Sequence, residues 1–304
     1  MKPYLVVFFV LCSLIGFGQK KTLNQCYLKF CNPEVNIGYL YRHYNHFQDF
    51  FPHEKMQEYS IQSFSIIKEE LNVNQTLFTY FFDENGFVNQ YTRMENNSQT
   101  FYEREYDKIT KRKYLNNPTD KDTSILYYFY TQNLIIKSYD FPGHHIGQGV
   151  SNLFIDDENR VSQTIYYVRV GENILDSTST KYNYDKDNLS CSFFVREEQC
   201  IVKFNHEGQP IKEQSYKDSL LHLETNFSYN TIGQLIEYSE KTLRPIPIKD
   251  NTGNWILPST NNLSNYIIEK KKVIFHYNAN GLLEKIIQTT DEGICEYRVY
   301  YYTE

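Results

Sequence analysis

Apolar and polar residues follow a phrase that recurs along the chain at a spacing of about 24 residues. The phrase is a run rich in aromatic residues, then Asp or Asn, two further residues, Gly or Asn, and an apolar residue. Clear copies cover residues 80–88, 203–208, 228–235 and 276–283. A fixed period of this kind indicates an architecture of repeated structural units. The pattern therefore predicts a protein built from similar units.

Each phrase has the chemistry of a β-hairpin turn. The side chain of Asp or Asn accepts a hydrogen bond from the backbone two residues further on. The fourth position needs a positive φ, which Gly adopts without steric cost and Asn tolerates. A type I turn followed by such a residue makes a common three-residue hairpin. The predicted turns begin and end at Asp83 and Gly86, Asp156 and Asn159, Asp185 and Asn188, Asn205 and Gly208, Asn230 and Gly233, Asp250 and Gly253, and Asn278 and Gly281. Weaker copies lie at residues 107–110 and 130–133.

Turns of different chemistry alternate with these, as at residues 95–98, 217–219 and 291–293. The alternation predicts an antiparallel meander with regular turns at one end and variable loops at the other. Half of the period leaves strands of roughly 8–10 residues. Strands of this length, repeated along the whole chain, are too numerous for a flat open sheet. We therefore predict an all-β protein that forms a large curled sheet, a spiral or an open barrel.

The repeated phrase resembles the YD repeats of RHS-type proteins. Residues 79–88, 181–189, 227–235 and 275–283 carry the resemblance, and residues 250–256 resemble the Gly-Asn-Trp variant of such repeats. The resemblance implies long antiparallel sheets that wind into shells or spirals, often in exported proteins. Large members of the family enclose a toxin domain, whereas this chain is short and shows no toxin or self-cleaving core. The resemblance implies a fold, and it implies no catalytic residue.

Composition and the N-terminal residues divide the chain into three parts. The content of 28 Tyr and 21 Phe in 304 residues suits pleated strands. Lys2 precedes an apolar run, so residues 1–18 are predicted to be a signal peptide. Residues 19–57 lack the repeat and are predicted to cap the β domain of residues 58–304. We expect a protein exported by a Gram-negative bacterium to the periplasm, the cell surface or the medium, with no membrane span after cleavage.

The net charge of −6 argues against nucleic acid as a partner, because that would need a basic face. Export permits disulfides. Cys191 and Cys200 flank a tight turn around Glu197, so a cross-strand bond between them is predicted. The alternative is that the cysteines are small buried apolar residues.

The N-terminal part holds one weak candidate for a metal site. On a helix, His43 and His46 would share a face and Asp49 would follow one turn on, and three such groups can bind a transition metal. The reading that we favour is a capping segment whose aromatic residues cover the first sheet edge. No cofactor is predicted.

Motifs of catalysis are missing from the sequence. There is no Gly-x-Ser-x-Gly elbow, phosphate-binding Gly loop or His-Glu-x-x-His. Most carboxylates, such as Asp83, Asp156 and Asp185, lie on separate turns with a conformational role. Catalysis therefore stays open, with a non-catalytic protein favoured.

We expect a protein that presents a sheet face or its variable loops to a protein or carbohydrate partner. Trp255, Tyr300 and Tyr302 are the candidate binding aromatics. The alternatives are a hydrolase with a site in the concave face and an accessory protein of a toxin system. The Tyr-rich strand at residues 294–302 should not remain an open edge. We predict that it closes the sheet on an early strand rather than pairing with a partner.

Overall fold

The structure is a computed structural model of the 304-residue chain. It describes residues 53–303 except for 71–72, 95–96, 106–107, 116–122, 132–133, 141–147, 158–159, 171, 188, 196, 208, 250–251, 253 and 257–265. The predicted signal peptide, residues 19–52 of the predicted cap, and the candidate ligands His43, His46 and Asp49 lie outside the described residues. Those predictions remain untested.

The described residues form one short helix, α3 (His53–Glu58), and twenty strands. The first ten strands are β1 (Ser63–Glu70), β2 (Val73–Phe82), β3 (Val88–Arg93), β4 (Ser98–Glu105), β5 (Lys108–Leu115), β6 (Thr123–Tyr130), β7 (Leu134–Asp140), β8 (Gln148–Ile155), β9 (Val161–Val170) and β10 (Asn173–Asp185). The others are β11 (Ser190–Val195), β12 (Glu198–Phe204), β13 (Pro210–Lys217), β14 (Leu220–Tyr229), β15 (Leu235–Pro245), β16 (Ile248–Lys249), β17 (Trp255–Ile256), β18 (Tyr266–Tyr277), β19 (Leu283–Thr290) and β20 (Gly293–Tyr302).

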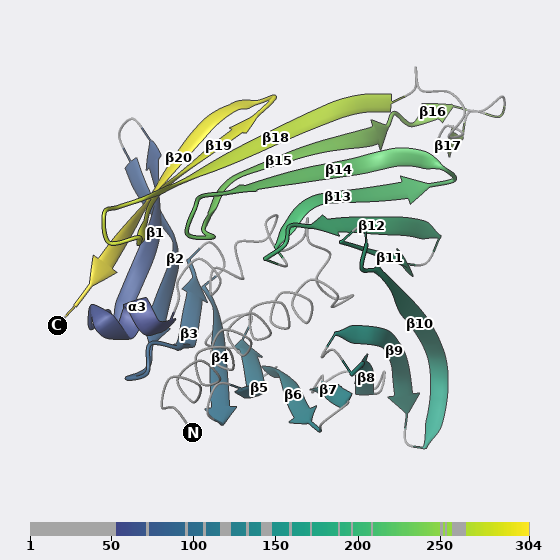
Figure 1. Ribbon diagram of the computed structural model, residues 1–304, viewed down its shortest axis with the longest axis horizontal. Coiled ribbons are helices and arrows are strands. Elements are labelled where there is room, and N and C mark those ends of the chain that lie inside the picture. The colour runs from purple at the N-terminus through teal and green to yellow at the C-terminus, as the bar shows by residue number, and fades with distance from the viewer. Residues whose placement is uncertain are drawn as a thin grey trace, which may run out of the picture.

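Eighteen of these strands form one antiparallel sheet in which each strand pairs with the next along the chain. Strand β15 pairs with β18, because β16 and β17 form a separate hairpin. The last strand, β20, pairs with β1, with Ser63 opposite Tyr302 and Ile66 opposite Val299. Figure 1 shows the strands following one another round a loop. The predictions of an all-β meander in a curled sheet, and of a C-terminal strand that pairs with an early one, are confirmed.

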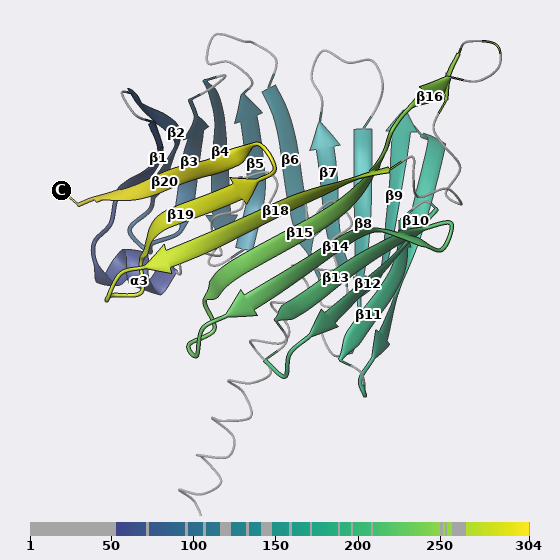
Figure 2. The same cartoon turned by 90° about the horizontal axis from the view of Figure 1, so that it is seen from above.

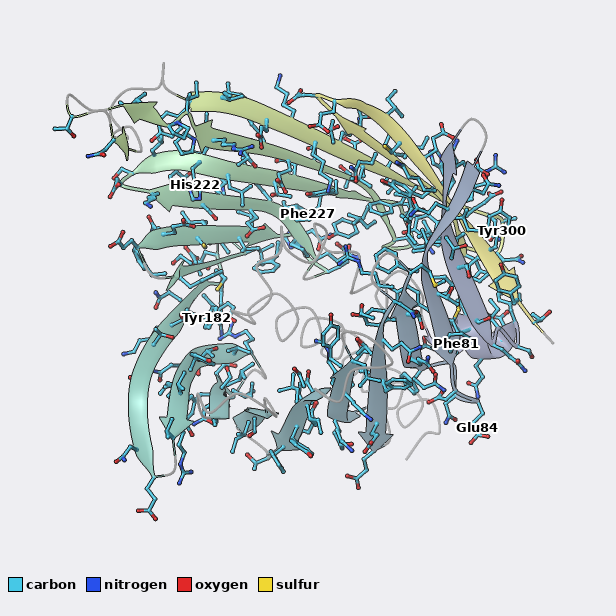
Figure 3. The ribbon with its side chains drawn as sticks, turned by 180° about the vertical axis from the view of Figure 1, so that it is seen from behind. Phe81, Glu84, Tyr182, His222, Phe227 and Tyr300 are labelled. Carbon is cyan, nitrogen blue, oxygen red and sulfur yellow. The ribbon has the colours of Figure 1, made fainter. Side chains whose placement is uncertain are left out.

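The curled sheet has two walls, and its buried side chains lie between them. Strands β11–β20 cross in front of β3–β9 at an angle in Figure 2. Along β14, buried Leu223, Thr225 and Phe227 alternate with more exposed residues such as Glu224, as the two-residue period of a strand requires. Figure 3 shows Phe227 and Tyr182 pointing to the inside. We call this surface the inner face and the opposite one the outer face.

A row of aromatic rings crosses the inner face where the two ends of the sheet meet. Tyr301 on β20 lies 5.8 Å from Phe64 on β1, and Phe64 stacks on Tyr80 of β2 at 4.6 Å. The row continues from Tyr80 to Tyr91 at 5.5 Å and from Tyr91 to Tyr102 at 6.4 Å, measured between ring centroids. These separations are favourable for aromatic pairs. The row therefore stabilises the junction of β20 with β1.

The first regular turn has the predicted geometry. Asp83 Oδ1 accepts hydrogen bonds from the backbone N–H groups of Asn85 (2.9 Å) and Phe87 (3.0 Å). The N–H of Gly86 donates to the carbonyl of Asp83 at 2.9 Å, and Gly86 has a φ of 78°. This is the type I turn with a left-handed fourth residue that the sequence predicts.

The same bonds recur at the turns that begin at Asn230 and Asn278, where Gly233 and Gly281 have φ of 82° and 72°. The predicted turns at residues 156–159, 185–188 and 205–208 are described in part. The bond from Asp156 N–H to the carbonyl of Arg160 (2.8 Å) and the bond from Asp187 N–H to Asp185 Oδ1 (3.1 Å) follow the same pattern, as does the bond from Asn205 N–H to the carbonyl of Gln209 (2.8 Å). Asp250 and Gly253 lie outside the described residues, while β16 and β17 pair on either side of them.

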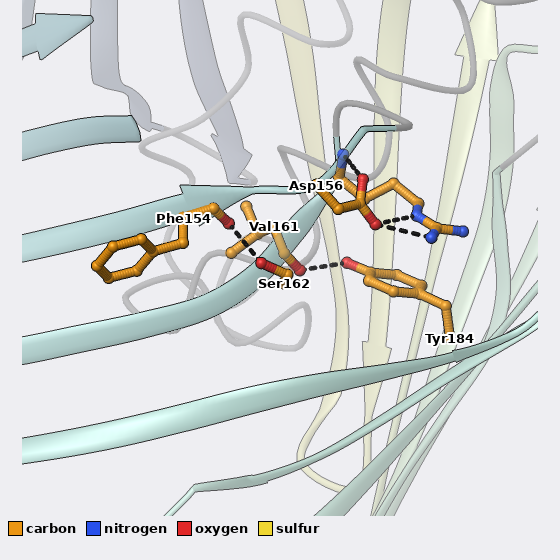
Figure 4. Close-up of polar contacts among 6 residues, drawn as sticks. Phe154, Asp156, Val161, Ser162 and Tyr184 are labelled. Atoms are coloured by element: carbon orange, nitrogen blue, oxygen red, sulfur yellow. Dashed lines mark hydrogen bonds and ion pairs between the residues drawn. The ribbon is translucent and has the colours of Figure 1, made fainter. Parts of the chain in front are cut away.

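Tyrosine hydroxyls connect successive regular turns. Figure 4 shows the Tyr184 hydroxyl donating to the carbonyl of Val161 at 2.8 Å, just after the preceding turn. Arg160 lies over the Tyr184 ring at 4.4 Å and holds Asp156 through an ion pair of 2.7 Å. The same donation recurs from Tyr229 to Pro210 (2.9 Å), from Tyr277 to Leu235 (2.8 Å) and from Tyr301 to Leu283 (2.7 Å). Tyr184, Tyr229 and Tyr277 each precede the turn residue of their phrase, and each therefore satisfies a backbone carbonyl in the neighbouring hairpin. Tyr301 on the last strand does the same without a turn after it.

Side-chain amides join the same turns along their edge. Gln209 Nε2 donates to the carbonyl of Gly233, and Gln234 Nε2 donates to the carbonyl of Gly281, each at 2.7 Å. Lys55 Nζ of α3 then donates to the carbonyl of Asn280. One line of hydrogen bonds thus runs from turn to turn and ends on the helix.

The structure corrects two expectations about strand position. Cys191 and Cys200 are buried and are not joined by a disulfide, so the prediction of a bond between them is wrong. Cys191 lies opposite Val202 and Cys200 opposite Phe193, which makes the two cysteines diagonal neighbours and not a directly facing pair. The weak turn copy at residues 107–110 is also wrong, because β5 already begins at Lys108.

Candidate binding site

Three exposed rings lie on the outer face where β20, β1 and β2 are side by side. Ser63 on β1 lies opposite Tyr302 on β20 and opposite Phe81 on β2, and Ser65 lies opposite Tyr300. Phe81, Tyr300 and Tyr302 are 39%, 40% and 48% exposed, and Figure 3 places Tyr300 outside the ring of strands. The side chains that lie between the rings, Ser63 and Ser65, are small.

A hollow of about 680 Å³ lies beside these rings. One side comes from α3 and the residues after it: Met56, Gln57, Ser60 and Ile61. The sheet and its first regular turn supply the other lining residues: Gln62, Ser63, Phe81, Phe82, Asp83, Glu84, Asn89 and Gln90. The volume is within the range of about 300–1,000 Å³ that is usual for small-molecule sites. Several side-chain amides and one exposed ring therefore share a concave surface.

Backbone hydrogen bonds fix the walls of the hollow. The N–H of Gln62 donates to the carbonyl of Tyr302 at 3.0 Å, and the carbonyl of Gln62 accepts from the N–H of Phe82 at 2.9 Å. Met56 is fully buried in the core, and its carbonyl accepts a bond of 2.8 Å from the N–H of Ile61. The short helix is therefore anchored against the sheet beside the site.

The lining is acidic. Asp83 and Glu84 carry carboxylates, and none of the lining residues that the structure describes carries a cation. Lys55 of α3 is bound to the carbonyl of Asn280. Asp83 Oδ1 accepts hydrogen bonds from backbone N–H groups of its own turn, whereas the Glu84 side chain is exposed at the tip of that turn.

Glu69 orders the far end of the ring cluster. Its Oε2 lies 3.0 Å from Arg298 Nε, and its Oε1 accepts a longer bond of 3.5 Å from the Tyr300 hydroxyl. All three residues are on the outer face of β1 and β20. The ion pair links the first and last strands beside the exposed rings.

The structure brings together two of the three predicted aromatics. Tyr300 and Tyr302 are neighbours on β20, but Trp255 belongs to the β16–β17 hairpin, which is far from the end of β20 in Figure 1 and Figure 2. Sequence reasoning did not single out Phe81, which lines the hollow. The signal was present, since alternation in Tyr80-Phe81-Phe82 places the middle ring on the face opposite the other two.

Other reactive groups lie away from this hollow. His222 Nε2 is 3.3 Å from Glu198 Oε2 on the wall of β12 and β14. Cys200 Sγ lies 3.5 Å from Ser215 Oγ, inside the core. In the part of the chain that the structure describes, no group of three or more His, Cys, Asp or Glu residues is placed to hold a metal ion. No helix there is long and apolar enough to cross a membrane.

Comparisons with known proteins give likenesses in structure but none in sequence. No protein-family model and no curated protein matches the chain. Among solved structures, the crystal structure of TcdB2-TccC3-Cdc42 aligns with a TM-score of 0.26 and 10% identity over 72% of this chain, which spans 16% of that chain. A porin-like protein from Bacteroides uniformis aligns with a TM-score of 0.27 and 8% identity over 80% of this chain and 98% of that one.

Proposed function

We propose that this chain is an exported, non-catalytic β-repeat protein that binds carbohydrate on the outer face of β20, β1 and β2. The observation that supports the proposal is the hollow beside Phe81, which combines an open ring with the amides of Gln62, Asn89 and Gln90.

The lining suits a sugar. The C–H face of a pyranose stacks on an aromatic ring, and its hydroxyls exchange hydrogen bonds with amides, which both donate and accept. Tyr302 lies two strands from Phe81, or about 10 Å away, so a chain of sugars can reach both rings across Ser63. A protein partner would also use exposed rings, but a concave, amide-rich hollow favours a small polar ligand over a flat interface.

Alanine substitutions test the site. A glycan panel first identifies a ligand, and calorimetry then measures its Kd for the parent, Phe81→Ala and Tyr302→Ala. Each variant should bind roughly tenfold more weakly, because a stacking contact of about 1–2 kcal/mol is lost. Phe194→Ala is the matched control, since Phe194 is 56% exposed but lies on β11.

Two results would overturn the assignment. In the first, Phe81→Ala and Tyr302→Ala bind the glycan as the parent does. In the second, no glycan binds while a protein partner is captured through the same rings, which makes the surface a protein interface. Circular dichroism of each variant separates loss of binding from loss of folding.

Export has its own test. Expression in a Gram-negative host followed by intact-mass analysis should show a mature chain that begins at Gln19. Recovery of the chain with residues 1–18 still attached would contradict export through this signal.

A further inference from the structure

The charge of the hollow restricts the carbohydrate that it can take. Two carboxylates, Asp83 and Glu84, face a site whose other described lining residues are uncharged, and the chain as a whole has a net charge of −6. An anionic sugar would meet two like charges at the lining. An uncharged sugar would leave the carboxylates without a role in binding.

Two features of the lining, an aromatic ring and a carboxylate, favour an ammonium group. The face of an aromatic ring attracts a cation within about 6 Å of its centroid. A carboxylate adds a charge-assisted hydrogen bond to an N–H donor. Phe81 and Glu84 come from one strand and the turn that directly follows it, so both can act on one ligand.

The two carboxylates differ in what they are free to do. Asp83 Oδ1 is committed to the N–H groups of Asn85 and Phe87, and its removal would disturb the turn. Glu84 is exposed at the second position of the turn, where the backbone makes no demand on the side chain. Glu84 is therefore the specificity-determining carboxylate.

We infer that the hollow beside Phe81 selects a carbohydrate with free amino groups, that is, a chain of deacetylated amino sugars. The inference rests on the proposed carbohydrate site and adds the class of sugar. The ammonium group lies between the ring of Phe81 and the carboxylate of Glu84, and the sugar hydroxyls meet the amides of Gln62, Asn89 and Gln90.

Three tetramers with the same linkage test this selection. They are the cellulose tetramer, the chitin tetramer and the deacetylated chitin tetramer, which carry a hydroxyl, an acetamide and an amine at the same carbon. Calorimetry at a pH of about 6, below the usual range of amine pKa values, compares their Kd values. The amine form should bind roughly three- to thirtyfold more tightly than the other two, from one cation–π contact and one exposed ion pair.

Glu84→Gln should remove most of this preference. Glu207→Gln is the matched control, because Glu207 is an exposed Glu on the regular turn at residues 205–208. The preference of the parent should also weaken in high salt, which screens exposed charges.

The outcomes separate this inference from the proposed function. If all three tetramers bind equally, or if Glu84→Gln keeps the preference, the selection for amines is wrong while the carbohydrate site stands. If the acetamide form binds best, the hollow selects acetylated sugars, and Glu84 does not determine the specificity. If none of the three binds and the glycan panel is also negative, the proposed function itself fails.

Discussion

Several tyrosines in this protein both pack a ring in the core and donate a hydrogen bond through the hydroxyl. Only the packing of the ring could be predicted from the sequence. The ring fills the inner face, as the aromatic content predicts, but the hydroxyl reaches a carbonyl in the neighbouring hairpin. Tyr277 donates to Leu235 over 42 positions of sequence separation. Because that partner is set by the pairing of whole strands, the spacing of the phrase alone could not identify it.

Removal of one such hydroxyl should destabilise the fold. Tyr277→Phe leaves the carbonyl of Leu235 without this donor, and we expect a loss of about 1–2 kcal/mol in the free energy of unfolding. Urea denaturation measures it. Tyr302→Phe, at a ring that is 48% exposed, should change stability little. Equal curves for the two variants would show that the buried hydroxyl bond does not contribute.

Buried titratable groups should make the protein sensitive to alkali. Burial raises the pKa of the Cys200 thiol from about 9 to about 11, and its hydrogen bond with Ser215 acts in the opposite direction. Burial also raises the pKa of Tyr277 and of Tyr301. The unfolded chain therefore releases these protons at a lower pH than the folded chain does, so the contribution of these three groups to stability is constant below about pH 9 and falls as the pH rises further.

Chemical denaturation at a series of pH values measures this fall. The thiol alone should account for roughly 3 kcal/mol between pH 9 and pH 11. In Cys200→Ala the fall should be smaller, and the remainder belongs to the tyrosines. A free energy of unfolding that stays level to pH 11 would show that these groups are as accessible to solvent as in the unfolded chain.

At the scale of elements, the regular turns could be predicted because their chemistry is local. The side chain of Asp83 or Asn230 bonds to backbone only two and four residues away, so the sequence contains the whole motif. Strand register is different, since it depends on which residues face each other across a ladder. The disulfide prediction failed for this reason, as Cys191 and Cys200 are offset by two residues.

The turn glycines can be tested at Gly233. Its φ is 82°, and an added Cβ would lie 3.2 Å from Gln209 Nε2. Gly233→Val should therefore cost about 1–3 kcal/mol, through backbone strain and displacement of the Gln209 amide. Thermal and urea unfolding provide the measure. Gly233→Asn should retain more of the stability because Asn tolerates a positive φ, and a Val variant as stable as the Asn variant would contradict the turn geometry.

At the scale of the whole molecule, the sheet is defined by the contact between its two ends. A meander of many strands could be predicted from the turns, and so could the need to protect the last strand. The exact partner could not, because β1 and β20 are joined by side chains from opposite ends of the chain: Phe64 with Tyr301, and Glu69 with Arg298. The candidate site was only half predicted for the same reason, since Phe81 and Tyr302 lie on either side of Ser63 only when these ends come together.

A short deletion isolates this contact. Residues 293–298 of β20 pair with β19, whereas residues 299–302 pair with β1 alone. Deleting residues 299–304 should thus keep the last hairpin and break half of the junction. We expect the melting temperature of the whole domain to fall, because both freed edges and the inner aromatic row become exposed.

Deletion of residues 303–304 alone is the control and should melt like the parent. If the longer deletion also melts like the parent but loses an oligomer or a binding partner, β20 is an interaction edge and the junction with β1 is dispensable. Size-exclusion chromatography of the same samples distinguishes these cases.

The meeting of β20 with β1 also bears on how such a protein can change in evolution. In an open array, each repeat contacts only its neighbours, so a unit can be gained or lost at an end at local cost. Here the first and last strands are themselves neighbours. Duplication or loss of one hairpin would alter the circumference of the sheet, the spacing of the inner aromatic rings and the alignment of Phe81 with Tyr302 at once. We therefore expect the number of hairpins to be constrained as a single trait.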